Sequence, residues 1–227
     1  MRRLLLFDID GTLVWGGPAK DVFHGAMVET FGTAGDIEVH SFAGKTDPQI
    51  ARELLRGAGL EDEAIDEGLP DLWRRYLQGL EEGLVERPMD VLPGVPELLE
   101  ALARLDDVGL ALLTGNIVDG ARLKLGSAGL YHHFTTGSYG SDAESRDDLP
   151  DVALRRAREA WGVAFPVDEV VVVGDTPRDV QCGRSAGTRT MGVATGHHDV
   201  VALREAGADH VLDHFEDTGA VVELLAG

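Results

Sequence analysis

The sequence predicts an α/β fold, in which a doubly wound, mainly parallel, Rossmann-like sheet carries a helical cap inserted after the first strand. Three observations support this prediction. Short apolar runs recur without polar alternation, which is typical of strands buried on both faces of a parallel sheet. Helical patterns separate several of these runs, as in a chain of β-α units. Residues 15–90 interrupt the series, because they contain helical patterns and no strong strand pattern.

The apolar runs and the helical patterns place the elements of the core. Strands are expected at residues 4–7, 109–114, 169–175, 188–194 and 209–212. Helices are expected at residues 96–105 and 150–162, where apolar residues recur at spacings of three and four. These elements assign residues 1–14 and 91–227 to an α/β core.

The interrupting segment is predicted to be a helical cap over residues 15–90. Helices are expected there at residues 19–31, 47–57, 61–67 and 70–83. Gly16-Gly17-Pro18 at one end and the segment from Pro88 to Pro93 at the other are rich in turn-forming residues. Both are candidate hinges between cap and core.

The composition narrows the class of partner. The formal net charge of -20 argues against nucleic acid and anionic membranes as partners, because both are polyanions, but it leaves a small anionic substrate open. The apolar run after Arg2-Arg3 ends at Asp8, short of the ~7–15 residues of a secretory signal. The single cysteine, Cys182, excludes an intramolecular disulfide and has no thiolate-activating neighbour in sequence. We expect a soluble, cytoplasmic protein; its oligomeric state is not predicted.

Polar residues follow three of the expected strands at once. Asp8 and Asp10 follow the first strand, and residues two apart in a strand point the same way. Thr114-Gly115-Asn116 ends the second strand, and residues 174–179, GDTPRD, end the third. Each group alone is explained by the turn preferences of Asp, Asn, Thr and Gly. Together they favour a binding site, because ligands of open parallel sheets bind beyond the carboxyl ends of the strands.

Three carboxylates at this edge predict a metal ion. Asp8, Asp10 and Asp175 would repel one another if left alone, and a divalent cation removes the repulsion. Hard oxygen ligands without His or Cys suit Mg²⁺, which also bridges readily to phosphate. The pair His197-His198 is expected in a loop rather than at a metal.

Three motifs resemble those of a known family. DIDGTLV (8–14), LLTGN (112–116) and VVVGDTPRD (171–179) are similar to the first, second and fourth motifs of the haloacid dehalogenase-like hydrolase superfamily. Their order and spacing match over roughly the whole chain. PGVPELLEAL (93–102) and the helical insertion resemble the branch that contains phosphoglycolate phosphatase-like and β-phosphoglucomutase-like members.

The resemblance implies a Mg²⁺-dependent phosphatase that acts on a small phosphomonoester. Asp8 would be the nucleophile that forms an aspartyl-phosphate. Asp10 would first protonate the leaving alcohol and then activate water. The hydroxyl of Thr114 and the backbone amides of Gly115 and Asn116 would bind the phosphoryl oxygens.

The same resemblance implies the ligands of the metal. Mg²⁺ would be held by the side chain of Asp8, the backbone carbonyl of Asp10 and the side chain of Asp175. Asp179 would support these ligands without binding the metal itself.

One motif departs from the family pattern. The third motif normally supplies a Lys before the GDxxxD strand, but residues 140–157 contain none. Arg146 is the nearest cation and would offer bidentate geometry in place of a point charge. Lys124 is the rival, with a solvated helix face as its simpler role. We favour Arg146.

The segment FAGKTDPQI (42–50) is the part of the cap expected to influence substrate choice. Gly44-Lys45-Thr46 resembles the end of a phosphate-binding P-loop, but that motif needs Gly at position 39, which is Val. Lys45 is either a ligand of a substrate anion or a solvated loop residue. Gly44 and Asp47 are then expected to be a turn residue and a helix cap.

Alternative functions remain open from sequence. A phosphomutase of the same fold would also retain Asp10, and a phosphonate hydrolase could use Lys45 as a Schiff base. Halide displacement is disfavoured, because the dehalogenase relatives lack the second Asp. A non-catalytic phosphate-binding regulatory module would be expected to have lost part of the set Asp8, Asp10 and Asp175, which is intact.

Overall fold

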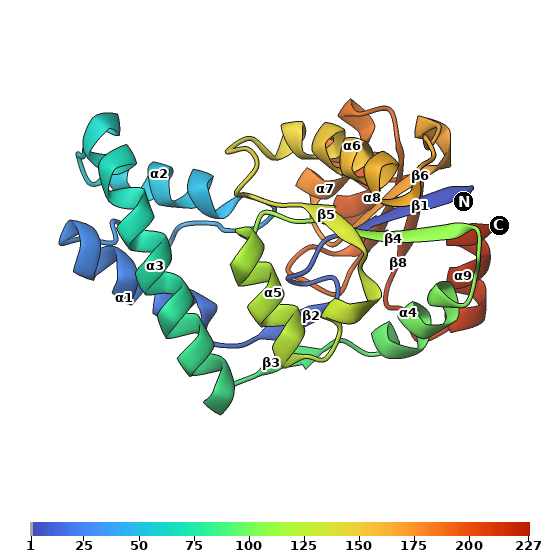
Figure 1. Cartoon of the computed structure of the whole chain (residues 1–227), viewed down its shortest axis with the longest axis horizontal. Coiled ribbons are helices and arrows are strands. Elements are labelled where there is room, and N and C mark those ends of the chain that lie inside the picture. The colour runs from blue at the N-terminus through green and yellow to red at the C-terminus, as the bar shows by residue number, and fades with distance from the viewer. Residues whose placement is uncertain (1) are drawn as a thin grey trace.

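An entirely parallel six-stranded sheet forms the core of the computed structural model, which describes residues 2–227 (Figure 1). The strand order is β5-β4-β1-β6-β7-β8. The strands are β1 (Arg3–Phe7), β4 (Val108–Leu113), β5 (Thr136–Ser138), β6 (Val170–Gly174), β7 (Arg189–Val193) and β8 (His210–Leu212). The α/β class and the parallel sheet are confirmed. Strand β5 was not predicted, because its three residues, TGS, carry no apolar signal.

Strand β1 lies at the centre of the sheet and shows why its residues are apolar throughout. It pairs with β4 on one side and β6 on the other, so that Leu5 lies opposite both Leu110 and Val171. All five of its residues are buried. Such a strand cannot alternate apolar and polar residues, because both faces of the sheet are covered.

Helices cover the two faces of the sheet and bury alternate residues of β1. Leu5 and Phe7 pack into the larger core with α4 (Val95–Ala103), α5 (Val118–Ser127) and α9 (Thr218–Ala226). Leu4 and Leu6 pack into a second core with α6 (Leu149–Trp161) and α7 (Pro177–Ser185). Figure 1 shows α6 and α7 above the sheet and α4 and α9 below it. The short helix α8 (Val200–Glu205) connects β7 to β8.

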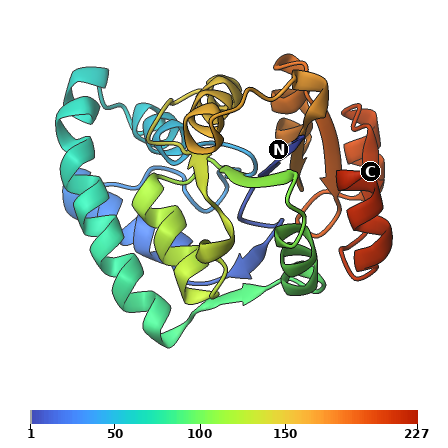
Figure 2. The same cartoon turned by 45° about the vertical axis from the view of Figure 1, so that its right-hand side comes forward.

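A helical unit is inserted between β1 and β4 and lies beside the sheet (Figure 2). It contains α1 (Ala19–Phe31), α2 (Asp47–Gly57) and α3 (Asp62–Glu86). The chain leaves and returns through an antiparallel pair of short strands, β2 (Val14–Gly16) and β3 (Met89–Val91), which the sequence did not predict. These strands fall on the two segments expected to be hinges. The division into a core and a cap at residues 15 and 90 stays a prediction.

The expectation of separate helices at residues 61–67 and 70–83 is wrong. A single helix, α3, runs through Pro70 for 25 residues. A proline removes one backbone donor and disfavours a helical residue before it, so it reads as a break in sequence. Pro70 is exposed, while a buried stripe that includes Ile65, Leu72 and Tyr76 continues past it. Packing of this stripe outweighs the local cost of the proline.

No helix within residues 2–227 combines the length and the apolar character that a membrane crossing requires.

Candidate active site

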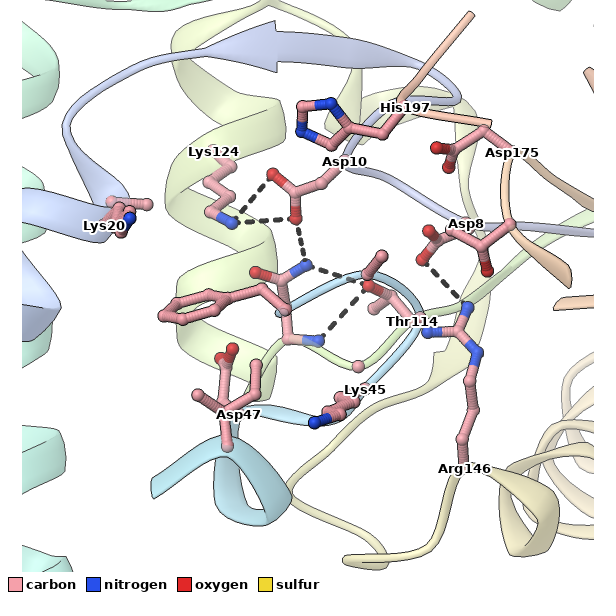
Figure 3. A pocket seen from close by; sticks show the side chains of 18 of the residues that line it. Asp8, Asp10, Lys20, Lys45, Asp47, Thr114, Lys124, Arg146, Asp175 and His197 are labelled. Carbon is pink, nitrogen blue, oxygen red and sulfur yellow. Dashed lines mark hydrogen bonds and ion pairs between the residues drawn. The ribbon is translucent and has the colours of Figure 1, made fainter. Parts of the chain in front are cut away.

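The carboxyl ends of three neighbouring strands meet at one cavity of about 240 Å³ (Figure 3). Asp8 follows β1, Thr114 follows β4 and Asp175 follows β6, and all three side chains line the cavity. The helical unit closes the opposite side with residues that include Phe42 and Lys45. The strand ends singled out in the sequence therefore do converge.

The turn after β1 brings the first motif against the third strand end. The Asp8 amide donates to the carbonyl of Val173 at 2.9 Å, which continues the pairing of β1 with β6. Gly11 then adopts a φ of +83°, a conformation open to glycine and costly for other residues. A Cβ at this position would lie 2.6 Å from Cγ of Asp175. Both the backbone conformation and the close approach thus require glycine.

Three buried carboxylates gather beside this turn. One oxygen from each of Asp8, Asp175 and Asp179 lies within 4.8 Å of the other two. Asp175 accepts a hydrogen bond of 3.1 Å from the hydroxyl of Thr12. Asp179 is the most occupied of the three, because its Oδ2 accepts from the amide of Thr176 at 2.9 Å and from its hydroxyl at 2.7 Å. The amide of Asp179 in turn donates to the hydroxyl oxygen of Thr176 at 3.2 Å, and this bond and the one from the Thr176 amide form a capping box that starts α7 directly after β6.

Arg146 is the cation at the acidic cluster. It belongs to a short 3₁₀ helix, Arg146–Asp148, and is 6% exposed. One guanidinium nitrogen lies 3.1 Å from Oδ1 of Asp8 and also contacts the carboxylate of Asp179. The same nitrogen donates to the carbonyl of Leu113 at the end of β4. Arg146 therefore links the ends of β1 and β4 to the first turn of α7.

Lys124 pairs with the other carboxylate of the first motif. Its Nζ lies 2.9 and 2.8 Å from the two oxygens of Asp10. The side-chain nitrogen Nδ2 of Asn116 donates to the same carboxylate at 2.6 Å and to the hydroxyl oxygen of Thr114 at 2.9 Å. Lys124 is buried, so the expectation of a solvated helix face is wrong for it. The two rival cations hold different carboxylates.

A sequence model of the haloacid dehalogenase-like hydrolases matches residues 3–187, a span that contains Asp8, Asp10, Thr114, Arg146 and Asp175. The chain belongs to this hydrolase family.

Relatives of this hydrolase cover most of its length. It is 28% identical over 224 residues to a phosphoglycolate phosphatase of Pseudomonas savastanoi pv. phaseolicola, covering 93% of the chain and 76% of the relative. It is 34% identical over 173 residues to a phosphoserine phosphatase of Thermus thermophilus, covering 75% of the chain and 64% of the relative. The crystal structure of a hydrolase from Pseudomonas syringae is similar over the full length of both chains, with a TM-score of 0.73 and 23% identity.

Burial and mutual repulsion raise the pKa values of Asp8 and Asp175 in the acidic cluster of this hydrolase. Burial, opposed by Arg146 and reinforced by Asp179 and Asp10, raises the pKa of Asp8 to about 6. Burial and the nearby Asp179 and Asp8 raise the pKa of Asp175 to about 8. A divalent cation would relieve this repulsion, and the donor set consists of the carboxylate oxygens that hard cations prefer. The residues therefore fit a divalent metal.

The two buried cations remain charged. Burial alone would lower the pKa of Arg146, but Asp179 and Asp8 outweigh it, so that the pKa rises. The same balance holds for Lys124, where Asp10, with help from Tyr76 and Asp47, raises the pKa despite burial. Each cation therefore offers a fixed positive charge to the cavity.

The loop that leads into α2 lies against the loop that follows β4. The expectation that Asp47 caps a helix is wrong, because Thr46 is the N-cap and accepts from the amide of Gln49 at 3.2 Å. Asp47 instead reaches across, donating its amide to the carbonyl of Gly115 at 2.7 Å and accepting from the amide of Ile117 at 2.8 Å. The helical unit is thus bonded directly to the phosphate-binding candidates.

Lys45 and Gly44 lie in the same loop. Gly44 is a turn residue, as expected, with a φ of +66°. The side chain of Lys45 is 11% exposed, bonds the carboxylate of Glu53 and lies 3.1 Å from the ring of His40. It also lines the cavity, so a solvated loop position is wrong for it. Its contact with a substrate anion stays a prediction.

Sequence reasoning missed a fourth strand end at the cavity. His197, which follows β7, was expected only in a loop, yet it lines the cavity. Its ring packs edge-on against Trp15 at 4.9 Å between centroids. The available signal was the position after β7, since this strand ends at the same edge of the sheet as β1, β4 and β6.

We expect Asp47→Asn to stabilise the protein above about pH 6 and to have no effect below pH 4. Burial raises the pKa of Asp47 from 3.8 to about 6. The charge of Lys124 and the hydrogen bond from the amide of Ile117 lower this pKa, and the charge of Asp10 raises it, but burial has the largest effect. A raised carboxyl pKa contributes stability that is present below the unfolded value and lost as the pH rises through the folded value. The asparagine retains an acceptor for Ile117 and never ionises.

The melting temperatures of both proteins, measured between pH 4 and 8, test this expectation. Asp36→Asn, at an exposed aspartate, is the matched control and should follow the wild type. A constant difference between wild type and Asp47→Asn across this range would contradict the pKa assigned to Asp47.

Proposed function

We propose that this hydrolase is a Mg²⁺-dependent phosphatase, which cleaves a small phosphomonoester through an aspartyl-phosphate on Asp8. The observation that carries the proposal is the position of Asp8 at the floor of the cavity. One of its carboxylate oxygens lies within 4.8 Å of oxygens of Asp175 and Asp179, and Oδ1 lies 3.1 Å from the guanidinium of Arg146. The family match and the phosphatases among its relatives support the same chemistry.

In the first step, an oxygen of Asp8 attacks phosphorus and the bond from phosphorus to the leaving oxygen breaks. Asp10, whose side chain is 45% exposed, gives its proton to that oxygen. The Thr114 hydroxyl and the amides of Gly115 and Asn116 would hold the phosphoryl oxygens, while Arg146 would balance their charge.

In the second step, water attacks the phosphorus of the aspartyl-phosphate. Asp10 takes a proton from this water, phosphate leaves, and the carboxylate of Asp8 is restored. Lys124 and Asn116 would keep Asp10 directed at the leaving oxygen and then at the water, because both donate to its carboxylate.

Asp8, Asp175 and the backbone carbonyl of Asp10 would hold the metal. When bound, Mg²⁺ would neutralise charge on the phosphoryl oxygens and on the crowded carboxylates. Asp179 would support the metal ligands without binding the metal itself, since its oxygens already accept hydrogen bonds from Thr176 and Arg146.

The lysines of the chain favour a substrate with a second anionic group. Only three of its 20 basic residues are lysines, and Lys20, Lys45 and Lys124 all line the cavity. Lys124 is paired with Asp10, and Lys45 is paired with Glu53. Lys20 is half exposed, and its ion pair with the exposed Glu38 is longer, at 3.4 Å. We propose that the leaving group carries a carboxylate, as glycolate and serine do, and that Lys20 and Lys45 attract it.

A panel of phosphomonoesters, assayed with Mg²⁺ and after chelation, tests this function. We expect phosphate release only with Mg²⁺, and faster release from phosphoglycolate and phosphoserine than from ethyl phosphate, whose leaving group is neutral. Lys20→Gln should narrow that difference while leaving hydrolysis of ethyl phosphate unchanged. Isomerisation of a sugar phosphate without phosphate release would contradict the phosphatase and favour a mutase.

A further inference from the structure

We infer that Gly196 and Thr195, which lie in the loop after β7, are positioning residues that fix the carboxylate of Asp175 at the proposed cation site. This inference rests on the proposed function, because it concerns the residue expected to bind the cation. Neither residue belongs to the three motifs that define the rest of the site. Figure 3 shows the chain near His197 passing directly beside Asp175.

Gly196 is required for space rather than for backbone conformation. It is absent from the glycines with positive φ among the described residues, so its backbone is open to other amino acids. A Cβ at this position, however, would lie 2.7 Å from Cγ of Asp175 and closer still to its Oδ2. The three nearest atoms all belong to the side chain of Asp175. Any larger residue must therefore displace this carboxylate.

Asp175 is held between two glycines. Gly11 approaches it from the turn after β1, with a Cβ position 2.6 Å from the same Cγ. The carboxylate of Asp175 also accepts a hydrogen bond of 3.1 Å at Oδ1 from the hydroxyl of Thr12. A substitution of Gly11 would also strain the backbone, because Gly11 has a positive φ. A substitution of Gly196 therefore tests the effect of lost space beside Asp175 without backbone strain.

Thr195 fastens the loop that carries Gly196. Its hydroxyl donates to the carbonyl of Gly11 at 2.6 Å, which joins the loop after β7 to the turn after β1. The two walls that enclose Asp175 are thus bonded to each other. Residues that orient a metal ligand in this way commonly affect metal affinity by about 10–100-fold.

The decisive experiment measures Mg²⁺ binding to metal-free protein by calorimetry, without any substrate. We expect Gly196→Ala to weaken Mg²⁺ binding at least about tenfold, and Thr195→Val to weaken it less. Gly126→Ala is the matched control, because Gly126 is exposed in α5 and nothing lies within 4 Å of its Cβ position. Binding by Gly196→Ala that equals the wild type would overturn the inference.

A double-mutant cycle tests the contact independently of the metal. Gly196→Ala should lower the melting temperature of the wild-type chain but leave that of Asp175→Ala nearly unchanged, because the two atoms that lie closest to the added Cβ, Oδ2 and Cγ of Asp175, are gone. Equal losses in both backgrounds would show that Gly196 does not act through Asp175. A wild-type protein that binds no Mg²⁺ would contradict the proposed cation site, and the cycle would still decide the role of Gly196.

Discussion

Asp8→Asn should lower phosphatase turnover by more than about 10⁴-fold while leaving the fold intact. An amide is a poor nucleophile toward phosphorus, and the carboxylate of Asp10 is held by Lys124 and Asn116. The substitution keeps the shape of the side chain and removes one charge from a crowded, buried cluster. The melting temperature of the metal-free variant should therefore match or exceed that of the wild type.

Turnover is measured as phosphate release from the best substrate of the panel, and folding by circular dichroism. Asp36→Asn serves as the control again, since it makes the same chemical change at an exposed site. The wild type should also acquire a phosphate on Asp8 during turnover, which mass spectrometry of rapidly quenched samples detects. A folded Asp8→Asn protein that retains the original rate would refute the role of Asp8.

Arg146→Met should have the second largest effect, on both activity and stability. It leaves the carboxylates of Asp8 and Asp179 buried without their cation. Removing one partner of a buried ion pair costs roughly 3–5 kcal/mol of folding free energy, because the other charge stays uncompensated. Loss of one preorganised charge at a reacting group costs a further factor of about 10²–10³ in rate.

Arg146→Lys separates these two effects. It restores the charge and should recover most of the stability. Its side chain is one bond shorter, however, so the ammonium does not reach the position of the guanidinium nitrogen that contacts both carboxylates and the carbonyl of Leu113. Lys124→Met is the comparison at the rival cation and should lose less rate, since Lys124 contacts Asp10 rather than Asp8. Arg122→Met, on the exposed face of α5, is the neutral control. A larger rate loss in Lys124→Met than in Arg146→Met would reverse the assignment.

The core could be predicted from sequence because its strands are buried on both faces. Runs such as LLLF and VVVV leave few other structures open, and the polar residues after them mark the same edge of the sheet. The strand β5 escaped prediction because its residues, TGS, are held by pairing with β4 rather than by their own apolar character. The continuous helix α3 escaped because local rules give Pro70 more weight than its exposed position deserves.

Part of the site could likewise be predicted from the sequence, and part could not. Sequence motifs named Asp8, Asp10 and Asp175, since Asp8 and Asp175 directly follow apolar strands and Asp10 lies two residues further on. They could not reveal which carboxylate each cation contacts, because Arg146 and Lys124 reach the cavity from different elements at similar depth. Nor could they reveal Gly196, whose importance comes from a neighbour 21 positions away in the chain rather than from its own conformation.

The placement of the lysines has a practical consequence for labelling. All three open onto one cavity, and Lys20 is the only one whose side chain is substantially exposed. Most proteins carry lysines over much of their surface. In this protein, reagents selective for lysine side chains would instead react at a single cavity. Surface attachment through lysine would obstruct this cavity, whereas coupling through carboxylates would be spread over the surface, because most of the 40 Asp and Glu residues lie outside the cavity.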